Sequence, residues 1–492
     1  MRPQEKLESL GVIVSGQGMP NHLEFCFQLG KNETRVGEFV EVLAEARVLI
    51  ARVYRIESYD AYYTDPEFIQ DHIRRGIPIA ARLPTAHARW RRVRAKIFGV
   101  FNTKDGRFTP PEIPSEPGEE VFPASESILR KLLGIKVGGV YIGLLRGKAL
   151  KIELDTEKLA RHHIAVLGAT GSGKSYLNAV LAEELLEKKY PVVVIDPHGE
   201  HTTFNRPAEG NPDERFGIEL CGYPQKIYYP KPVNPGKDYE ISLRLSELTA
   251  EELGEMTGAT DNQINLLYMA IRDVRTKFGE NYDLNQLLSV MAESAKTWKF
   301  AARTESSTAR RILILDELGI LGEGIDPKEL AKPGHVTIID LSGDISEIVR
   351  RITAAQLVYK LFQARKTGEI APTFLIVEEA HRFAPQEGEA YSKVVLRKIA
   401  REGRKFGLGL CITSQRAIGL DKDVLSQCGT KIILRIDNKS DLDWIRPFLE
   451  FATPEDIARI PTLPIGIALT TGVTTRQPIV TEVRPRKTRH GS

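Results

Sequence analysis

The strongest constraint on the fold of this chain is a glycine-rich segment, GATGSGKS, at residues 168–175. It has the spacing G-x-x-x-x-G-K-[ST] and lies between an apolar strand pattern, IAVL, and a helix pattern, SYLNAVLAEELLEKK. Glycines let such a loop curl until its backbone N–H groups point at a phosphate, and the following helix adds its positive dipole end. The segment therefore predicts a phosphate-binding loop inside an α/β fold.

The motif assigns a role to each of its polar side chains. We expect Lys174 to neutralise the β- and γ-phosphates of ATP and Ser175 to place its hydroxyl on Mg²⁺. The expected ATP-binding residues are Gly168, Ala169, Thr170, Gly171, Ser172, Gly173, Lys174, Ser175 and Tyr176.

From about residue 160 onward, the sequence has the pattern of a parallel β-sheet that is covered by helices on both faces. Near-continuous Val/Ile/Leu runs such as YPVVVID, HVTIIDLS and TKIILRI alternate with helical patterns. Runs of this kind indicate strands that are buried on both faces. Between about 243 and 330 the alternation stops and only helical patterns follow one another, which predicts an α-helical insertion. Residues 464–483 are typical of a closing β-hairpin.

The N-terminal part differs in composition and predicts a separate domain. Residues 1–105 are rich in β-branched and aromatic residues with glycine punctuation, and a small closed β-barrel fits them because closure removes exposed strand edges. We expect a Pro-rich linker with a short helix over 106–140, and the α/β domain over 141–483. A short basic tail, expected to be mobile, occupies 484–492.

A second acidic strand is expected to accompany the phosphate-binding loop. The apolar run PTFLIV ends in Glu378 and Glu379, at the end of a strand where ligands bind in open α/β sheets. Glu378 is expected to hold Mg²⁺ through water, and Glu379 to polarise an attacking water. A solvated pair of acids that merely ends a strand is the alternative.

Two further segments carry candidate catalytic groups. The run LGLCITSQ ends in Gln415, which could orient the water or sense the γ-phosphate, a role that glutamine has in other NTPases, or could merely cap a loop. Before it, Arg397, Arg401 and Arg404 are spaced to share one helical face. A guanidinium supplied across a subunit boundary could stabilise transition-state charge. A solvated basic face is the alternative.

The formal net charge of the chain is only +3. This value excludes the class of proteins that coat nucleic acid with a basic surface all round. A local cluster remains, in which Arg89, Arg91 and Arg92 fall within a run of five cations and one tryptophan. Contact with DNA phosphates is one interpretation of this cluster, and a solvated barrel face or a subunit contact is the other.

Other sequence features indicate the cellular compartment of the chain and the kinds of site that it lacks. The four cysteines form no C-x-x-C pair, which favours reduced thiols in a cytoplasmic protein over a disulfide scaffold or structural zinc site. We expect neither a signal peptide nor a transmembrane helix. In the segment DPHGEH, His198 and His201 lack matching metal ligands nearby, so we expect a loop beside the nucleotide site.

Four segments in this order closely resemble the HerA family: RHHIAVLGATGSGKS, VVVIDPHGEH, FLIVEEAHRF and KIAREGRKFGLGLCITSQR. That family belongs to the HerA/FtsK group of RecA-like motor ATPases. The resemblance covers about residues 140–480, and the barrel-like N-terminus is similar with weaker motifs. It implies a homohexameric ring with ATP between neighbours and double-stranded DNA in the channel. It also implies a NurA-type partner nuclease and a role in DNA repair, through end resection for homologous recombination.

The resemblance also carries residue roles. Lys174, Ser175, Glu378, Glu379 and Gln415 fall on the family's nucleotide, metal and catalytic positions. Arg404 matches the arginine that the group uses against the γ-phosphate, and Arg401 is the adjacent candidate. One departure precedes the loop: the family often has Arg-His before a strand, whereas this chain has Arg161-His162-His163. It stays open whether Arg161 or His162 takes the arginine's place.

Other functional classes compete with a DNA motor. One is a secretion ATPase of the related conjugation type, which usually acts at a membrane. Another is a nucleotide-gated ring scaffold that recruits a nuclease or other effector, as in phage defence. An ABC-type ATPase is disfavoured because LSGD at 341–344 is not the LSGGQ signature. The paired glutamates disfavour a small-molecule kinase.

Overall fold

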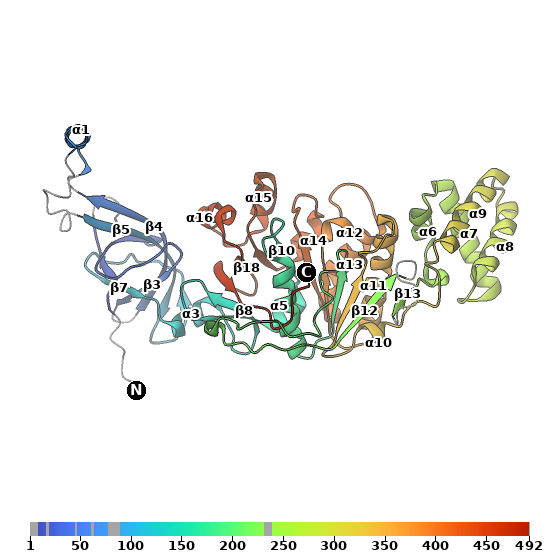
Figure 1. Cartoon of the computed structure of the whole chain (residues 1–492), viewed down its shortest axis with the longest axis horizontal. Helices are drawn as coiled ribbons and strands as arrows, with labels where there is room; N and C mark the ends of the chain where they lie inside the picture. The colour runs from blue at the N-terminus through green and yellow to red at the C-terminus, as the bar shows by residue number, and fades with distance from the viewer. Residues whose placement is uncertain are drawn as a thin grey trace. The chain divides into compact units, whose positions relative to one another are not determined.

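The computed structural model describes residues 8–15, 19–44, 47–60, 63–76, 89–230 and 239–491. The chain divides into two compact units (Figure 1). The first, which we call the barrel unit, comprises Met1–Ile135 and Arg146–Leu150. The second, the ATPase unit, comprises Lys136–Leu145 and Lys151–Ser492.

Six antiparallel strands close into a barrel in the first unit, as the sequence predicted. The ring is complete because β2 pairs with β5 as well as with β1. One of the six, β7, lies inside the segment expected to be a linker and joins β1 to β3. In order around the barrel the strands are β1 (Gly11–Ile13), β2 (Glu24–Leu29), β5 (Arg89–Asn102), β4 (Arg47–Asp60), β3 (Phe39–Ala44) and β7 (Glu120–Pro123).

Three smaller elements complete the barrel unit. Strand β6 (Phe108–Thr109) pairs with β5 outside the ring. Helix α3 (Glu126–Leu133) has buried leucines on one face, whereas helix α1 (Pro66–Arg74), between β4 and β5, has no buried residue. The side chains at alternate positions of the strands fill the barrel, among them Phe27 and Val93.

A twelve-stranded sheet forms the centre of the ATPase unit. Its strands from β13 to β17 are parallel and those from β17 to β9 are antiparallel. In sheet order they are β13 (Glu240–Ile241), β12 (Gln225–Pro230), β14 (Val336–Asp340), β11 (Val192–Asp196), β15 (Thr373–Val377), β16 (Leu408–Ser414), β10 (Ile164–Leu167), β17 (Thr430–Ile433), β18 (Ile467–Gly472), β19 (Ile479–Val483), β8 (Val140–Leu145) and β9 (Lys151–Leu154). The predicted parallel-type sheet and closing hairpin are confirmed.

Helices cover this sheet and bury its apolar strands. They are α4 (Thr156–His162), α5 (Lys174–Glu187), α10 (Pro327–Leu330), α11 (Glu347–Thr367), α12 (Ala380–Phe383), α13 (Tyr391–Phe406), α14 (Lys422–Gln427), α15 (Lys439–Ile445) and α16 (Pro454–Arg459). Single turns of 3₁₀ helix lie at Glu214–Phe216, Leu245–Glu247, Arg446–Phe448 and Ile460–Thr462. No helix in the described ranges combines the length and apolar character needed to cross a membrane.

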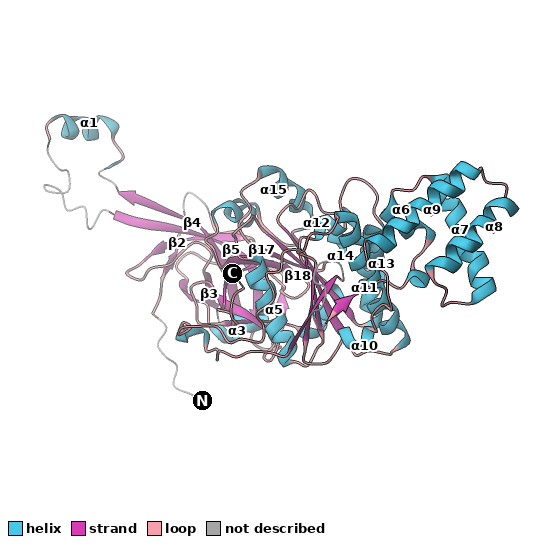
Figure 2. Cartoon of the chain, turned by 45° about the vertical axis from the view of Figure 1, so that its right-hand side comes forward, coloured by secondary structure: helices cyan, strands magenta, loops and turns pink. Residues whose placement is uncertain are grey.

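The predicted helical insertion is a bundle with its own apolar core. It consists of α6 (Ala250–Thr257), α7 (Asp261–Phe278), α8 (Leu284–Thr297) and α9 (Ala302–Glu317), which lie together at one end of the ATPase unit (Figures 1 and 2). Capping boxes at Thr249, Thr260 and Asp283 fix where α6, α7 and α8 begin. These three helices therefore start at signals that the sequence itself carries.

The C-terminal segment, residues 484–491, is not the free basic tail that the sequence predicts. It packs against α5, and the side chains of Arg484 and Thr488 are fully buried there. The reason is charge: Glu183, Glu184 and Glu187 of α5 accept hydrogen bonds from the cations of this segment.

Candidate nucleotide-binding site

The loop 168–175 connects β10 to α5 and has the backbone that a phosphate-binding loop needs. Gly171 and Gly173 have φ of 71° and 101°, in the region that favours glycine. A Cβ on Gly168 would lie 2.6 Å from Oγ of Ser172 and 2.8 Å from Cβ of Leu434, so a larger residue would displace the loop. Backbone conformation and close packing therefore explain why glycine occupies these positions of the motif.

Lys174 lies within this loop. Its Nζ donates to the carbonyl oxygen of Ala169 at 3.0 Å. Burial lowers the pKa of Lys174, and the nearby carboxylates of Glu379 and Glu378 oppose this shift. The lysine is therefore a buried cation between the loop and the paired acids, where a phosphate would replace the carbonyl oxygen as its hydrogen-bond partner.

Strand order brings the predicted groups to one edge of the sheet. Strand β16 pairs with β10 on one side and with β15 on the other, so the glycine loop, Gln415 and the paired glutamates all follow neighbouring parallel strands. Thr170 of the loop donates its hydroxyl to Oε1 of Gln415. The predicted nucleotide and catalytic positions thus lie together, and their individual roles stay predictions.

Glu378 is held by two side chains that the sequence analysis did not assign to the site. Asn178 Nδ2 and His201 Nε2 each lie 2.7 Å from Oε1 of Glu378, and Glu378 is 4% exposed. Burial lowers the pKa of His201, but the hydrogen bond and charge of Glu378 outweigh it and raise the pKa. Asp196 fixes the loop of His201 by accepting from its backbone N–H at 2.9 Å.

One signal in the sequence points to Asn178, and a weaker one to His201. Asn178 follows Lys174 by four residues, so both lie on the same face of α5. His201 lies in the loop that the sequence analysis placed beside the nucleotide site, without a ligand or partner.

Glu379 has a strained backbone and an ionised side chain. Its φ is 47°, in the left-handed region, where it starts α12. Burial raises its pKa, but His381, with Nδ1 3.1 Å from Oε2, and Lys174 lower it more, so the net pKa lies below the ordinary value. His381 Nδ1 also lies 3.0 Å from Oγ of Ser414. An ionised, desolvated carboxylate can polarise a water molecule.

The donor set fits Mg²⁺. Mg²⁺ prefers oxygen ligands and usually takes one or two from the protein, with waters and substrate phosphates completing its shell. Oε2 of Glu378 makes no hydrogen bond within the described part of the chain, and the Ser175 hydroxyl makes none there either. These two oxygens are therefore available to a metal ion or to its waters.

The three arginines of α13 differ in their partners. Arg397 pairs with Asp421 at 2.7 Å and Arg401 with Asp423 at 2.8 Å. Arg404 is exposed and has no hydrogen bond or ion pair to the residues that the structure describes. Of these three arginines, Arg404 is thus the one whose charge is not paired with an acid among the described residues of its own subunit.

In the run Arg161-His162-His163, the third residue has a structural role. It is buried; its Nδ1 accepts from the backbone N–H of Leu410, and its Nε2–H donates to the carbonyl of Ala400, both at 3.1 Å. Burial lowers its pKa to about 4, so it is neutral. His163 therefore ties α13 to β16, whereas Arg161 is exposed and His162 half-buried.

The basic cluster of the barrel is largely compensated by acids. Arg89 lies 3.4 Å from Asp60 and Arg91 lies 3.7 Å from Glu33. The guanidinium of Arg92 lies 5.0 Å from the centre of the Trp90 ring. Because the neighbouring carboxylates reduce the local positive potential, this face carries less attraction for DNA phosphates than its arginine count suggests.

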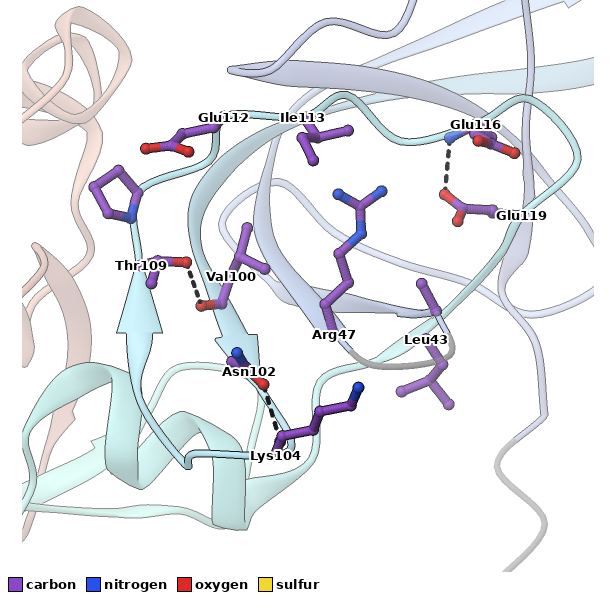
Figure 3. Close-up of a pocket in the computed structure, with 12 residues that line it drawn as sticks. Leu43, Arg47, Val100, Asn102, Lys104, Thr109, Glu112, Ile113, Glu116 and Glu119 are labelled. Atoms are coloured by element: carbon purple, nitrogen blue, oxygen red, sulfur yellow. Dashed lines mark hydrogen bonds between the residues drawn. The ribbon is translucent and has the colours of Figure 1, made fainter.

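The barrel unit contains a pocket of about 850 Å³ (Figure 3). Its lining contains both the cations Arg47 and Lys104 and the acids Glu112, Glu116 and Glu119. Arg47 donates to the carbonyl of Pro114 at 3.3 Å. Mixed charge of this kind does not select a polyanion.

Comparisons with known proteins give the family and the fold. Residues 140–361 match the family model described as the central domain of helicase HerA. The DNA double-strand break repair helicase HerA of Pyrococcus furiosus is 29% identical over an alignment of 433 positions, which covers 76% of this chain and 74% of that protein. A probable helicase of Methanocaldococcus jannaschii is 25% identical over an alignment of 507 positions, which covers 96% of this chain and 95% of that protein.

Solved structures agree on the fold. VirB4 of Thermoanaerobacter pseudethanolicus superimposes with a TM-score of 0.50 at 16% identity, over 71% of this chain and 97% of that one. The plasmid coupling protein TrwB, solved with ADP and Mg²⁺, gives a TM-score of 0.51 at 15% identity, over 74% and 92%. The predicted RecA-like P-loop fold is confirmed.

Proposed function

This chain belongs to the HerA family of helicases, and on that premise we propose that it is a ring-forming motor that translocates double-stranded DNA. It is an ATP-hydrolysing enzyme. The observation that carries the proposal is the meeting of the glycine loop, the paired glutamates and Gln415 at the edge of three neighbouring strands. Relatives named as DNA double-strand break repair helicases support DNA as the substrate.

Each side chain of the site has a task in this proposal. The loop amides and Lys174 bind the phosphates of ATP, and Glu379 accepts a proton from the attacking water that Gln415 orients. Mg²⁺, held by Ser175 and by Glu378 through water, would neutralise charge on the β- and γ-phosphates. His201 and Asn178 hold Glu378 in place.

The assembly and the partner are also proposed. We infer a homohexamer in which Arg404 of one subunit reaches the γ-phosphate bound by its neighbour, and its exposed, unpaired state among the described residues supports this. A NurA-type nuclease would act with the ring in end resection for homologous recombination. The names of the relatives support a repair role, and the family resemblance alone supports the nuclease.

The test combines ATPase rates, with and without linear duplex DNA, with particle mass by light scattering. We expect DNA-stimulated hydrolysis by a particle of about 330 kDa, six times the 55.0 kDa chain. Lys174→Ala should form the same particle without turnover. A ring whose slow turnover is indifferent to DNA would contradict the motor and favour a scaffold that recruits an effector.

A further inference from the structure

The C-terminal segment is anchored along α5, the helix that begins at the phosphate-binding loop. Arg484 donates to Glu183 and to Glu184, each at 2.9 Å, and all three side chains are buried. Further on, the backbone N–H of Thr488 donates to Glu183 at 2.9 Å. These contacts fix the path of the segment toward the start of the helix.

Its far end reaches the first turn of α5. The backbone N–H of Arg486 donates to the Tyr176 hydroxyl at 2.8 Å. The ring of His490 stacks on that of Tyr176, with centres 5.9 Å apart and planes 25° apart. Gly491 approaches the backbone of Glu200 so closely that a Cβ there would lie 2.5 Å from the Glu200 carbonyl oxygen. The segment thus lies against both the helix start and the 196–201 loop.

The rings of Tyr176 and His490 lie next to the predicted ATP site, at the start of the helix that follows the glycine loop. Lys174 and the paired glutamates mark where the γ-phosphate lies, and the loop amides hold the α- and β-phosphates. Tyr176 directly follows Ser175 in the first turn of α5. His490 is exposed, and Tyr176 is half-buried. Two aromatic rings therefore lie beside the loop that is expected to hold the phosphates.

Arg486 adds positive charge behind the two rings. It is 3% exposed, and its guanidinium lies 5.9 Å from the centre of the Tyr176 ring and 5.4 Å from that of Phe204. Its Nε has no hydrogen-bond partner within the described residues, and no carboxylate there forms an ion pair with it. The carboxylate of Glu183 offsets part of this charge, because it raises the pKa of Arg486 while burial lowers it.

We propose that the C-terminal segment forms the nucleoside wall of the ATP site, where the base packs against the rings of Tyr176 and His490. This inference rests on the proposed ATPase function. Stacking needs only a π-face, and its strength varies with the base, so the wall accepts purine nucleotides in general and binds pyrimidine nucleotides less tightly.

The test compares two probes, MgATP and the magnesium complex of inorganic tripolyphosphate, by calorimetry on the full chain. Tripolyphosphate occupies the loop but has no base. His490→Ala should weaken MgATP binding about tenfold and leave tripolyphosphate binding unchanged. His490→Phe, which keeps a ring, should restore ATP affinity. Arg489→Ala is the matched control, because Arg489 is adjacent but pairs with Glu209 at 3.1 Å, away from Tyr176.

The outcomes separate the two proposals. Unchanged ATP affinity in His490→Ala would overturn the nucleoside wall. An equal loss for both probes would also overturn it, because the segment would then merely support the loop. If the wild-type chain binds neither probe, the result would contradict the proposed ATPase function, and with it the proposed nucleoside wall. In the wild type, affinity that is the same for ATP and for CTP would contradict stacking.

Discussion

His201 Nε2 lies 2.7 Å from Oε1 of Glu378, and both side chains are buried although 177 residues separate them along the chain. The contact exists because β11 and β15 are neighbouring parallel strands, so the loops that follow them meet at one edge. His201 is therefore a positioning residue for the acid that is expected to hold Mg²⁺.

His201→Ala should lower kcat about 10- to 100-fold, because Glu378 would lose one of the two groups that orient it. KM for ATP should change much less, since the loop and Lys174 bind the phosphates. His201→Gln can still donate to Glu378 and should recover part of kcat. Steady-state kinetics checks this, and an equal change in KM and kcat that His201→Gln does not relieve would indicate a merely structural role.

Glu379→Gln should bind ATP and hydrolyse it about 10²- to 10⁴-fold more slowly, because an amide cannot accept the proton of the attacking water. The lowered pKa of Glu379 shows that the carboxylate is the form present at neutral pH. Single-turnover hydrolysis alongside ATP binding measures both properties. Glu387→Gln makes the same chemical change at an exposed site and should turn over normally. Wild-type turnover in Glu379→Gln would reassign the base.

Much of this site was predictable because it depends on local patterns. The glycine spacing, the acids at the end of PTFLIV and the glutamine after LGLCITS each follow from one strand and its flanking residues. Asn178 and His201 could not be assigned to Glu378 in the same way. Their partner is set by the order of β11, β15, β16 and β10 in the sheet, and no local pattern in the sequence encodes strand order.

Arg404 should act in trans, and mixed rings can show it. Arg404→Ala and Lys174→Ala should each be inactive alone, the former by about 10³-fold or more. Mixed together, they should regain ATPase activity, because some interfaces pair an intact Lys174 with an intact Arg404. Mixtures that stay inactive would place Arg404 in its own subunit's site. Arg401→Ala should lose less activity, since Arg401 is paired with Asp423.

His163 predicts how stability depends on pH. Its pKa is about 4 in the folded chain, below its ordinary value of 6.5, because burial disfavours the charged form. Between pH 6.5 and 4 the unfolded chain therefore binds a proton that the folded chain does not. Stability is full above about pH 6.5 and falls by about 3 kcal/mol on reaching pH 4.

Urea unfolding between pH 7.5 and 5 measures this effect. His163→Gln removes the titrating group and should be less stable at pH 7, because it disturbs the contacts to Leu410 and Ala400. Its stability should nevertheless depend less steeply on pH than that of the wild type. Parallel curves for the two proteins would show that His163 does not carry the dependence.

The C-terminal segment shows where sequence patterns mislead. RPRKTRHGS is polar and basic, which is typical of a solvated tail. Its cations instead meet three acids of α5, a helix about 300 residues earlier, and the pairs of Arg484 with Glu183 and Glu184 are buried. The same applies to β7, which lies in a proline-rich stretch but closes the barrel because β1 and β3 each offer it an edge.

Arg484 should be among the most costly residues to remove. Its side chain is fully buried between Glu183 and Glu184, so Arg484→Ala leaves two buried carboxylates with one cation fewer. Breaking a buried ion pair from one side costs about 3–5 kcal/mol. Arg489→Ala, which breaks the exposed pair with Glu209, should cost about 1 kcal/mol or less. Urea unfolding of both variants measures the difference, and equal stabilities would mean that the segment does not hold α5 in solution.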